Sequence, residues 1–201
     1  RLAGWTVDAE LERQLLQVLR MKPRRTASGV ATITVITKPW PCSGDCLFCP
    51  NDLRMPKSYL HAEPACARAE QNCFDPYLQV SARLTALSQM GHATDKIELI
   101  VLGGTWSDYP RAYQIWFITE LFRALNDADD KLPGRSSSFE AANVRERRQF
   151  YRDCGLSYER DDLVAFTQAQ QCLVDEGKLT YNEAMVNLYE TGEPWKVIAQ
   201  H

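Results

Sequence analysis

Apolar positions along the chain recur first at helical and then at strand-like spacing. Between residues 7 and 20 they return every three to four positions, which predicts an amphipathic helix that Pro23 terminates. Residues 31–38 are rich in β-branched side chains and predict a strand. Residues 76–90 return to helical spacing, and residues 97–102 form a nearly unbroken apolar run. Such a run is typical of a parallel strand that is buried on both faces.

The order of these elements predicts the fold class. A further apolar helix is expected over residues 111–127, directly after the second strand. Two successive strand–helix units indicate an α/β fold with a parallel sheet. Residues 132–138 predict a loop, and the chain beyond them predicts helices without a convincing strand. The last of these helices is expected to begin at a capping-box sequence, residues 180–183.

Composition sets only broad limits on function. The 201 residues are enough for one domain with a core, and 45% hydrophobic with 24% charged residues is ordinary for a globular protein. The net charge of −3 does not by itself indicate nucleic-acid binding. Basic residues nevertheless gather in two runs, one at residues 20–25 and one at residues 145–152. Each run is either a solvated helix surface or a contact for phosphate, and the sequence leaves both interpretations open.

The location of the protein is predicted from what the sequence contains. It shows no signal peptide and no stretch long enough to cross a membrane, so we expect no membrane partner and a cytoplasmic protein. Seven cysteines without regular disulfide spacing indicate a reducing compartment with a local metal site. Because the first residue is Arg1, we expect a piece of a longer protein.

Three of the cysteines lie in the loop after the first predicted strand. Cys42, Cys46 and Cys49 have the spacing C-x3-C-x2-C, and Gly44 allows a tight turn that directs the three sulfurs toward one centre. A structural zinc site would need a fourth ligand from elsewhere in the chain. A [4Fe-4S] cluster held by three thiolates keeps one iron open for a small molecule. The spacing favours the cluster, with a zinc knuckle and unligated cysteines as alternatives.

The end of the second predicted strand is a second candidate site. Gly103 and Gly104 stand there, followed by Thr105. Two glycines at the C-terminal end of a parallel strand let a ligand approach the backbone closely. The alternative is a simple turn between strand and helix.

Longer stretches resemble a known family. The cysteine spacing, with Phe48 directly before the last cysteine, resembles the motif of the radical S-adenosylmethionine superfamily. Over residues 22–127 the chain resembles the catalytic subunit of the Elongator complex and its bacterial and archaeal homologues. The stretches that carry this resemblance are "RRTASGVATITVITKPWPC", "KSYLHAEPACARA", "FDPYLQVSARLTALSQMGHATDKIELIVLGGTW" and "YQIWFITELFRALN".

The resemblance implies a fold and a set of site residues. It implies an incomplete radical-SAM-type parallel (β/α) barrel over residues 31–131, with an N-terminal helix and basic segment over 1–30 and a helical C-terminal segment over 132–201. It assigns no catalytic residue. The implied contacts are a [4Fe-4S] cluster on Cys42, Cys46 and Cys49, S-adenosylmethionine at Phe48, Gly103, Gly104 and Thr105, and tRNA phosphate at Lys22, Arg24, Arg25 and Lys38.

The resemblance also implies a reaction. Enzymes of this family split S-adenosylmethionine to a 5'-deoxyadenosyl radical, which takes a hydrogen from the acetyl group of acetyl-CoA, and the carbon radical then adds to the wobble uridine of tRNA. We therefore expect tRNA and an electron donor as partners. The family's acetyltransferase domain has no counterpart in the 201 residues, so that domain or a partner chain is expected to complete the activity. A zinc-stabilised nucleic-acid-binding module and a radical S-adenosylmethionine enzyme with a small-molecule substrate remain alternatives.

Overall fold

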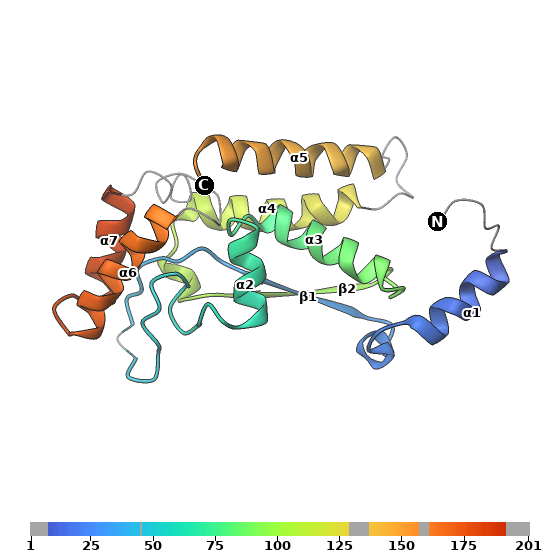
Figure 1. Cartoon of the computed structure of the whole chain (residues 1–201), viewed down its shortest axis with the longest axis horizontal. Helices are drawn as coiled ribbons and strands as arrows, with labels where there is room; N and C mark the ends of the chain where they lie inside the picture. The colour runs from blue at the N-terminus through green and yellow to red at the C-terminus, as the bar shows by residue number, and fades with distance from the viewer. Residues whose placement is uncertain (1–7, 45, 129–136, 157–160, 192–201) are drawn as a thin grey trace. The chain divides into compact units, whose positions relative to one another are not determined.

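The computed structural model describes residues 8–44, 46–128, 137–156 and 161–191. Helices dominate these ranges, and two short strands accompany them (Figure 1). In chain order the elements are α1 (Ala9–Leu19), the 3-10 turn η1 (Pro23–Thr26), β1 (Ala31–Ile36), α2 (Pro64–Gln71), α3 (Pro76–Gln89), β2 (Ile97–Leu102), the 3-10 turn η2 (Trp106–Asp108), α4 (Arg111–Asp127), α5 (Ser137–Asp153), α6 (Asp161–Asp175) and α7 (Tyr181–Thr191).

The two strands form a parallel pair. At its start the N–H of Ala31 donates to the carbonyl of Lys96, and at its end the N–H of Thr37 donates to the carbonyl of Leu102, both at 2.9 Å. The C-terminal ends of both strands therefore lie at one edge of the sheet. The predicted α/β class is confirmed, and closure of the sheet into a barrel stays a prediction.

The chain divides into two compact units. The first comprises residues 1–33 and 82–100, so it holds α1 and η1 together with parts of β1, α3 and β2. Asp8 caps α1 by accepting a hydrogen bond from the N–H of Leu11 at 2.7 Å. In the same unit, the hydroxyl of Thr26 lies 3.0 Å from Nδ1 of the buried His92.

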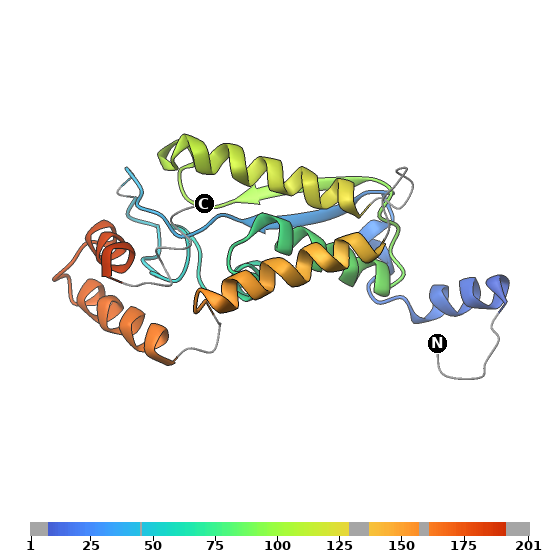
Figure 2. The same cartoon turned by 90° about the horizontal axis from the view of Figure 1, so that it is seen from above.

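The second unit comprises residues 34–81 and 101–201. Tyr77, Tyr113, Phe117 and Leu121 are buried at the start of α3 and along α4. Figures 1 and 2 show that α4 and α5 lie side by side and that α6 and α7 form a hairpin. No helix in the described ranges has the length and apolar character needed to cross a membrane.

The prediction that β2 is buried on both faces is wrong. β1 is largely buried, whereas Glu98, Ile100 and Val101 of β2 are exposed. Within the described residues β2 pairs with β1 alone, so its other edge and much of its surface face solvent. An apolar run specifies a strand, but its burial depends on what packs against it.

Candidate functional site

The cysteine loop, which we define as residues 38–58, leaves β1 at the edge where both strands end. Cys42 is buried, Cys49 is half-buried and Cys46 is exposed. The sulfurs of Cys42 and Cys46 lie 3.7 Å and 3.6 Å from the point where a Cβ on Gly44 would stand. These two thiols therefore both lie over Gly44, whereas the convergence of all three sulfurs on one centre stays a prediction. Phe48 is 96% exposed and projects into solvent.

Hydroxyl groups lie beside two of the three sulfurs. Sγ of Cys42 is 3.3 Å from the Thr105 hydroxyl, and Sγ of Cys49 is 2.9 Å from the Ser58 hydroxyl. Among the described residues, no three Cys, His, Asp or Glu side chains are already gathered as a metal-ligand set. The donors fit a cluster or zinc in type, because thiol sulfur is the ligand that both accept. Ligation by all three cysteines stays a prediction.

The turn between β2 and α4 anchors the front of the loop. The Asp108 carboxylate accepts hydrogen bonds from the N–H of Ser43 at 2.6 Å and from its hydroxyl at 3.0 Å. The same contacts hold the pKa of the Asp108 carboxyl below its usual value. Nε1 of Trp40 donates to the Asp108 carbonyl at 3.0 Å. Side chains of the loop and the turn are thus joined at several points.

The two glycines at the end of β2 have different structural roles. A Cβ on Gly103 would stand 1.9 Å from the Thr37 hydroxyl oxygen, so close packing of the strand ends requires glycine there. A Cβ on Gly104 would meet nothing closer than the hydroxyl of Tyr109, at 3.7 Å. Glycine is therefore required at position 103 for a structural reason that the sequence did not reveal. Its predicted cofactor contact stays a prediction.

A cavity of about 420 Å³ opens at this same edge of the sheet. Its size suits a small molecule, and two aromatic rings contribute to its wall. The backbone N–H of Gly103 hydrogen-bonds to the Tyr59 hydroxyl, while burial raises the pKa of that phenol. Trp106 is 37% exposed and lines the cavity. The full lining is Thr37, Tyr59, Val101, Leu102, Gly103, Gly104, Trp106 and Ile118.

The predicted phosphate contact of Lys38 is not supported. Its side chain is 1% exposed, and its ammonium lies 4.7 Å from the ring centre of Trp40 and 4.4 Å from that of Tyr113. Burial lowers the pKa of Lys38 to about 7. A cation enclosed by aromatic rings does not reach a phosphate on the surface.

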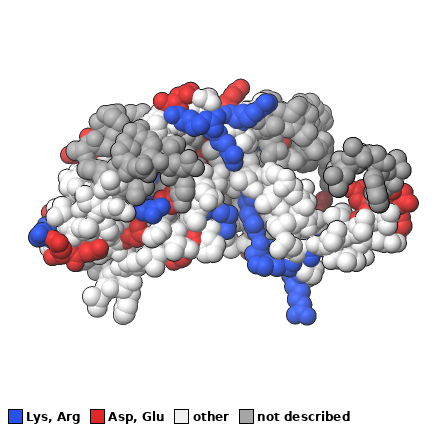
Figure 3. Space-filling model, in the orientation of Figure 1, with Lys and Arg blue, Asp and Glu red and all other residues white. Residues whose placement is uncertain are grey.

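Exposed cations are found in the first unit. Lys22, Arg24 and Arg25 are exposed on η1 and the residue before it. On the face drawn in Figure 3, the Lys and Arg atoms of the described residues appear as several separate groups, some of them next to Asp and Glu. Phosphate contact by the three residues stays a prediction.

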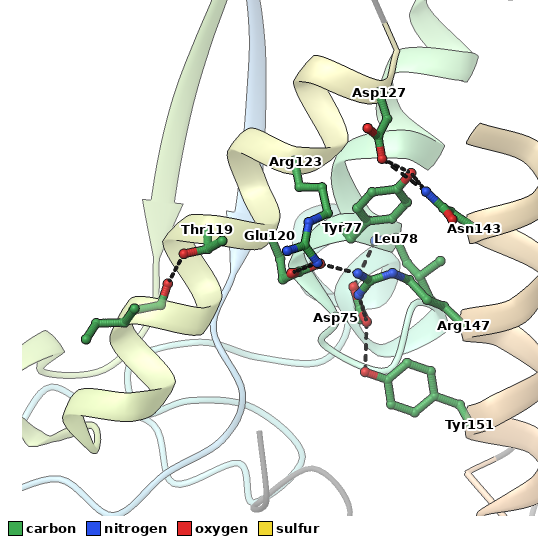
Figure 4. A network of polar contacts seen from close by, with 11 residues as sticks. Asp75, Tyr77, Leu78, Thr119, Glu120, Arg123, Asp127, Asn143, Arg147 and Tyr151 are labelled. Carbon is green, nitrogen blue, oxygen red and sulfur yellow. Dashed lines mark hydrogen bonds and ion pairs between the residues drawn. The ribbon is translucent and has the colours of Figure 1, made fainter. Parts of the chain in front are cut away.

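Part of the second basic run forms ion pairs within the protein. Arg147 on α5 forms ion pairs with Asp75, at 3.2 Å, and with Glu120 of α4 (Figure 4). Asp75 also caps α3 by accepting a hydrogen bond from the N–H of Leu78 at 3.0 Å. The hydroxyl of Tyr151 donates to the same carboxylate at 2.8 Å.

No role was predicted for residues 132–201, yet α7 contacts the cysteine loop. Asn182 hydrogen-bonds to the main chain of Cys42, and the hydroxyl of Tyr181 donates to the carbonyl of Met55 at 2.9 Å. The hydroxyl of Tyr189 donates to the carbonyl of Pro39. The capping box was the sequence signal that located the start of this helix, and it carried no indication of what the helix contacts.

Comparison with known proteins places this geometry in context. No protein-family model matches the chain. It is 45% identical over 171 residues to a tRNA uridine(34) acetyltransferase of Methanocaldococcus infernus, which covers 82% of the chain and 31% of that relative. It is 39% identical to a tRNA uridine(34) acetyltransferase of Dehalococcoides mccartyi, over 78% of the chain and 33% of the relative. It is 38% identical to Elongator complex protein 3 of Drosophila melanogaster, over 76% of the chain and 29% of the relative. The chain thus spans about a third of the length of these relatives.

Proposed function

The chain belongs to the family of Elongator complex protein 3 and the tRNA uridine(34) acetyltransferases, and from this premise we propose that it takes part in modifying the wobble uridine of tRNA. The observation that carries the proposal is identity of 38–45% over 76–82% of the chain to relatives with these names. The chain corresponds to the part of those relatives that would hold the cysteine loop. A further domain or a partner chain would supply the remaining acetyl-transfer function, with acetyl-CoA as donor.

The cysteine loop is the proposed centre of the chemistry. Cys42, Cys46 and Cys49 would hold a [4Fe-4S] cluster, and the convergence of the first two sulfurs over Gly44 supports this assignment. When bound through three thiolates, such a cluster supplies one iron without a protein ligand, and with it the capacity to bind and reduce S-adenosylmethionine. The hydroxyls of Thr105 and Ser58 would orient the outer two thiolates and adjust their basicity.

The cavity beside the loop is the proposed site of S-adenosylmethionine. Thr105 lies beside Cys42, and the neighbouring Gly104 lines the cavity, so the two proposed sites adjoin one another. Tyr59 and Trp106 would give the cavity aromatic walls that exclude water from the bound molecule. Because the net charge is negative, the proposed tRNA contact would be made by a local run of cations. Lys22, Arg24 and Arg25 are exposed and form such a run. An external electron donor is also part of the proposal.

Anaerobic reconstitution with iron and sulfide tests the cluster assignment. We expect the chain to bind iron and to develop a broad absorbance near about 400 nm, as thiolate-bound clusters do. Replacing Cys42, Cys46 and Cys49 together by Ala should abolish both signals. The matched control replaces Cys73, Cys154 and Cys172 by Ala and should retain them. A purified chain that binds one zinc ion and refuses iron would contradict the cluster and support the zinc-stabilised nucleic-acid-binding module.

Binding of tRNA at increasing salt concentration tests the substrate. We expect affinity to fall steeply with salt, and replacement of Lys22, Arg24 and Arg25 by Gln should reduce the salt slope by roughly one for each phosphate that is no longer neutralised. Replacement of Arg148 and Arg152, which are exposed in the other basic run, is the control and should leave the slope unchanged. A slope near zero in the unmodified chain would favour a small-molecule substrate.

A further inference from the structure

The side chain of Asn182 pairs with the main chain of Cys42 at two points. Its Oδ1 accepts a hydrogen bond from the N–H of Cys42 at 3.0 Å, and its Nδ2 donates to the carbonyl of Cys42 at 2.9 Å. Both main-chain polar groups of this cysteine are therefore bound to one side chain. A carboxamide suits this role because it offers a neutral acceptor and a donor side by side.

The same kind of contact recurs on either side of the cysteines. Gln171 of α6 accepts from the N–H of Leu53 at 2.9 Å and donates to the carbonyl of Asn51 at 2.8 Å. Gln79 accepts from the N–H of Ile36 at 3.0 Å and donates to its carbonyl at 2.9 Å. Carboxamides thus hold the chain where it enters the loop, at the first cysteine and after the last one. The repetition indicates a consistent way of holding this segment.

The start of α7 fixes where Asn182 stands. The carboxylate of Glu183 accepts a hydrogen bond from the N–H of Thr180 at 2.8 Å, and the Thr180 hydroxyl accepts one from the N–H of Glu183 at 3.2 Å. Next to Asn182, Tyr181 is buried and donates to the carbonyl of Met55. The first turn of α7 is therefore held both internally and against the loop.

These contacts limit the freedom of the Cys42 thiol. With both main-chain groups engaged, the sulfur can move chiefly by rotation about the side-chain bond. That sulfur lies beside Thr105 and over Gly44, where the Cys46 sulfur also lies. Removal of the Asn182 hydrogen bonds would release the main chain at Cys42, and the Cys42 sulfur could then move away from the Cys46 sulfur.

We propose that Asn182 is a positioning residue for Cys42 and that the α6–α7 hairpin is a clamp on the cysteine loop. The role of Cys42 as a cluster ligand rests on the proposed function, whereas the positioning of its main chain does not. Asn182 itself is exposed, so its replacement removes two hydrogen bonds and little packing. The C-terminal helices thereby have a task that no sequence motif indicated.

Alkylation of the metal-free chain by iodoacetamide tests the clamp without reference to any cluster. Peptide mass spectrometry gives a rate for each cysteine, and this rate follows the accessibility and thiolate fraction of the sulfur. Asn182→Ala should accelerate alkylation of the buried Cys42 by about tenfold or more, as expected for the removal of two hydrogen bonds. The rate at Cys172, which is exposed on α6, should not change and serves as an internal reference.

Two further variants separate positioning from general loosening. Asn187→Ala removes the donor to Gln170 on the neighbouring helix, at 3.3 Å, and should leave Cys42 protected. Asn182→Asp keeps an acceptor for the N–H of Cys42 but has no donor for its carbonyl, so its rate should be intermediate. Circular dichroism of each variant verifies that the helices persist, and Asn182→Asp decides if Asn182→Ala unfolds. Unchanged protection of Cys42 in a folded Asn182 variant, or equal acceleration in Asn187→Ala, would overturn the proposal.

Iron content after reconstitution provides the second readout. Asn182→Ala should hold less iron per chain than the unmodified protein and release it faster to a chelator, while Asn187→Ala should match the unmodified protein. If the unmodified chain holds no iron, the proposed function fails and the alkylation rates still decide the role of Asn182. If it holds iron and both measurements are unaffected by Asn182→Ala, only the clamp is wrong.

Discussion

Two regions of the second unit bind their polar groups in different ways. The α3–α5 network joins Asp75, Glu120 and Arg147 through ion pairs between side chains (Figure 4). The cysteine loop is held mainly through its main chain, by neutral carboxamides such as Asn182 and Gln171. In the network the side chains bind one another. At Cys42, Asn51 and Leu53 the carboxamides bind the backbone, so an exposed side chain such as Cys46 remains available for a ligand.

Electrostatics explains the difference. Burial alone would lower the pKa of Arg147, but the carboxylates of Asp75 and Glu120 outweigh it and raise the pKa. The charges in the network are thus tolerable because each has a partner. In a site that binds a ligand, the side chains that contact the ligand cannot all be engaged by other side chains. Hydrogen bonds to the main chain hold such a site in place and keep those side chains available.

The largest effect is expected from breaking the network. Arg147→Met leaves Asp75 buried without its cation and Glu120 with Arg123 alone, and we expect a loss of about 3–5 kcal/mol in the free energy of unfolding. Urea denaturation measures it. The control is Arg148→Met, at the exposed neighbouring position, which should change stability by less than about 0.5 kcal/mol. Equal stability of the two variants would show that the ion pairs are not what holds α5.

A second prediction concerns Lys38, whose ammonium is buried between the rings of Trp40 and Tyr113. Because its pKa falls from 10.5 to about 7, the unfolded chain binds a proton between those pH values that the folded chain has released. Stability from this group should therefore rise with pH through the window from 7 to 10.5 and be flat below it. Its contribution to the rise should be a few kcal/mol at most, reduced by the attraction of the rings for the ammonium.

Urea denaturation at two pH values within that window measures the effect. Lys38→Met should lack this part of the rise, whereas Lys178→Met, at an exposed lysine, should retain it. A parallel pH dependence in Lys38→Met and the unmodified chain would contradict the lowered pKa.

The two glycines at the end of β2 allow a comparison within the candidate site. Gly103→Ala would place a Cβ 1.9 Å from the Thr37 hydroxyl, and we expect a loss of about 1–3 kcal/mol as the strand ends separate. Gly104→Ala meets only ordinary contacts and should cost little by comparison. Thermal unfolding of the two variants checks the order. A larger loss in Gly104→Ala would indicate that the strand ends pack differently.

The smallest effect is expected at Ser58, whose φ of 87° lies in the region that favours glycine. Ser58→Gly relieves this strain and should stabilise the chain by up to about 1 kcal/mol, less the contribution of the hydroxyl's hydrogen bond with Cys49. Ser58→Ala also lacks the hydroxyl but keeps the strain, so it should be less stable than Ser58→Gly. Urea midpoints measured side by side test this, and the reverse order would show that the backbone at this position is not strained.

Much of the secondary structure could be predicted because its signals are local. The β-branched run predicted β1, the apolar run predicted β2 at residues 97–102, and the capping box predicted the start of α7. α2 was not predicted, since it is only eight residues long and its apolar residues are mostly small. Helical spacing needs several turns before it becomes distinct, which an eight-residue helix does not provide.

Predictions about burial were less successful, because burial is a property of neighbours. β2 has an apolar sequence but an exposed surface, and Lys38 has a charged side chain but lies between Trp40 and Tyr113. Cys172 is exposed, although cysteine is among the residue types that are most often buried. The type of a residue indicates only the average cost of burying it, and contacts with distant parts of the chain decide the outcome.

The sequence by itself determined the elements, the place of the three cysteines after a strand and the family of the chain, because these depend on residues that are close together. Only the tertiary structure decided that Gly103 must be glycine, that Lys38 is enclosed and that Asn182 holds Cys42. Asn182 and Cys42 stand 140 residues apart, and a lone carboxamide on a helix has no periodicity or motif that reveals its partner. Hydrogen bonds between such groups exist only once the chain has folded and brought donor and acceptor within reach.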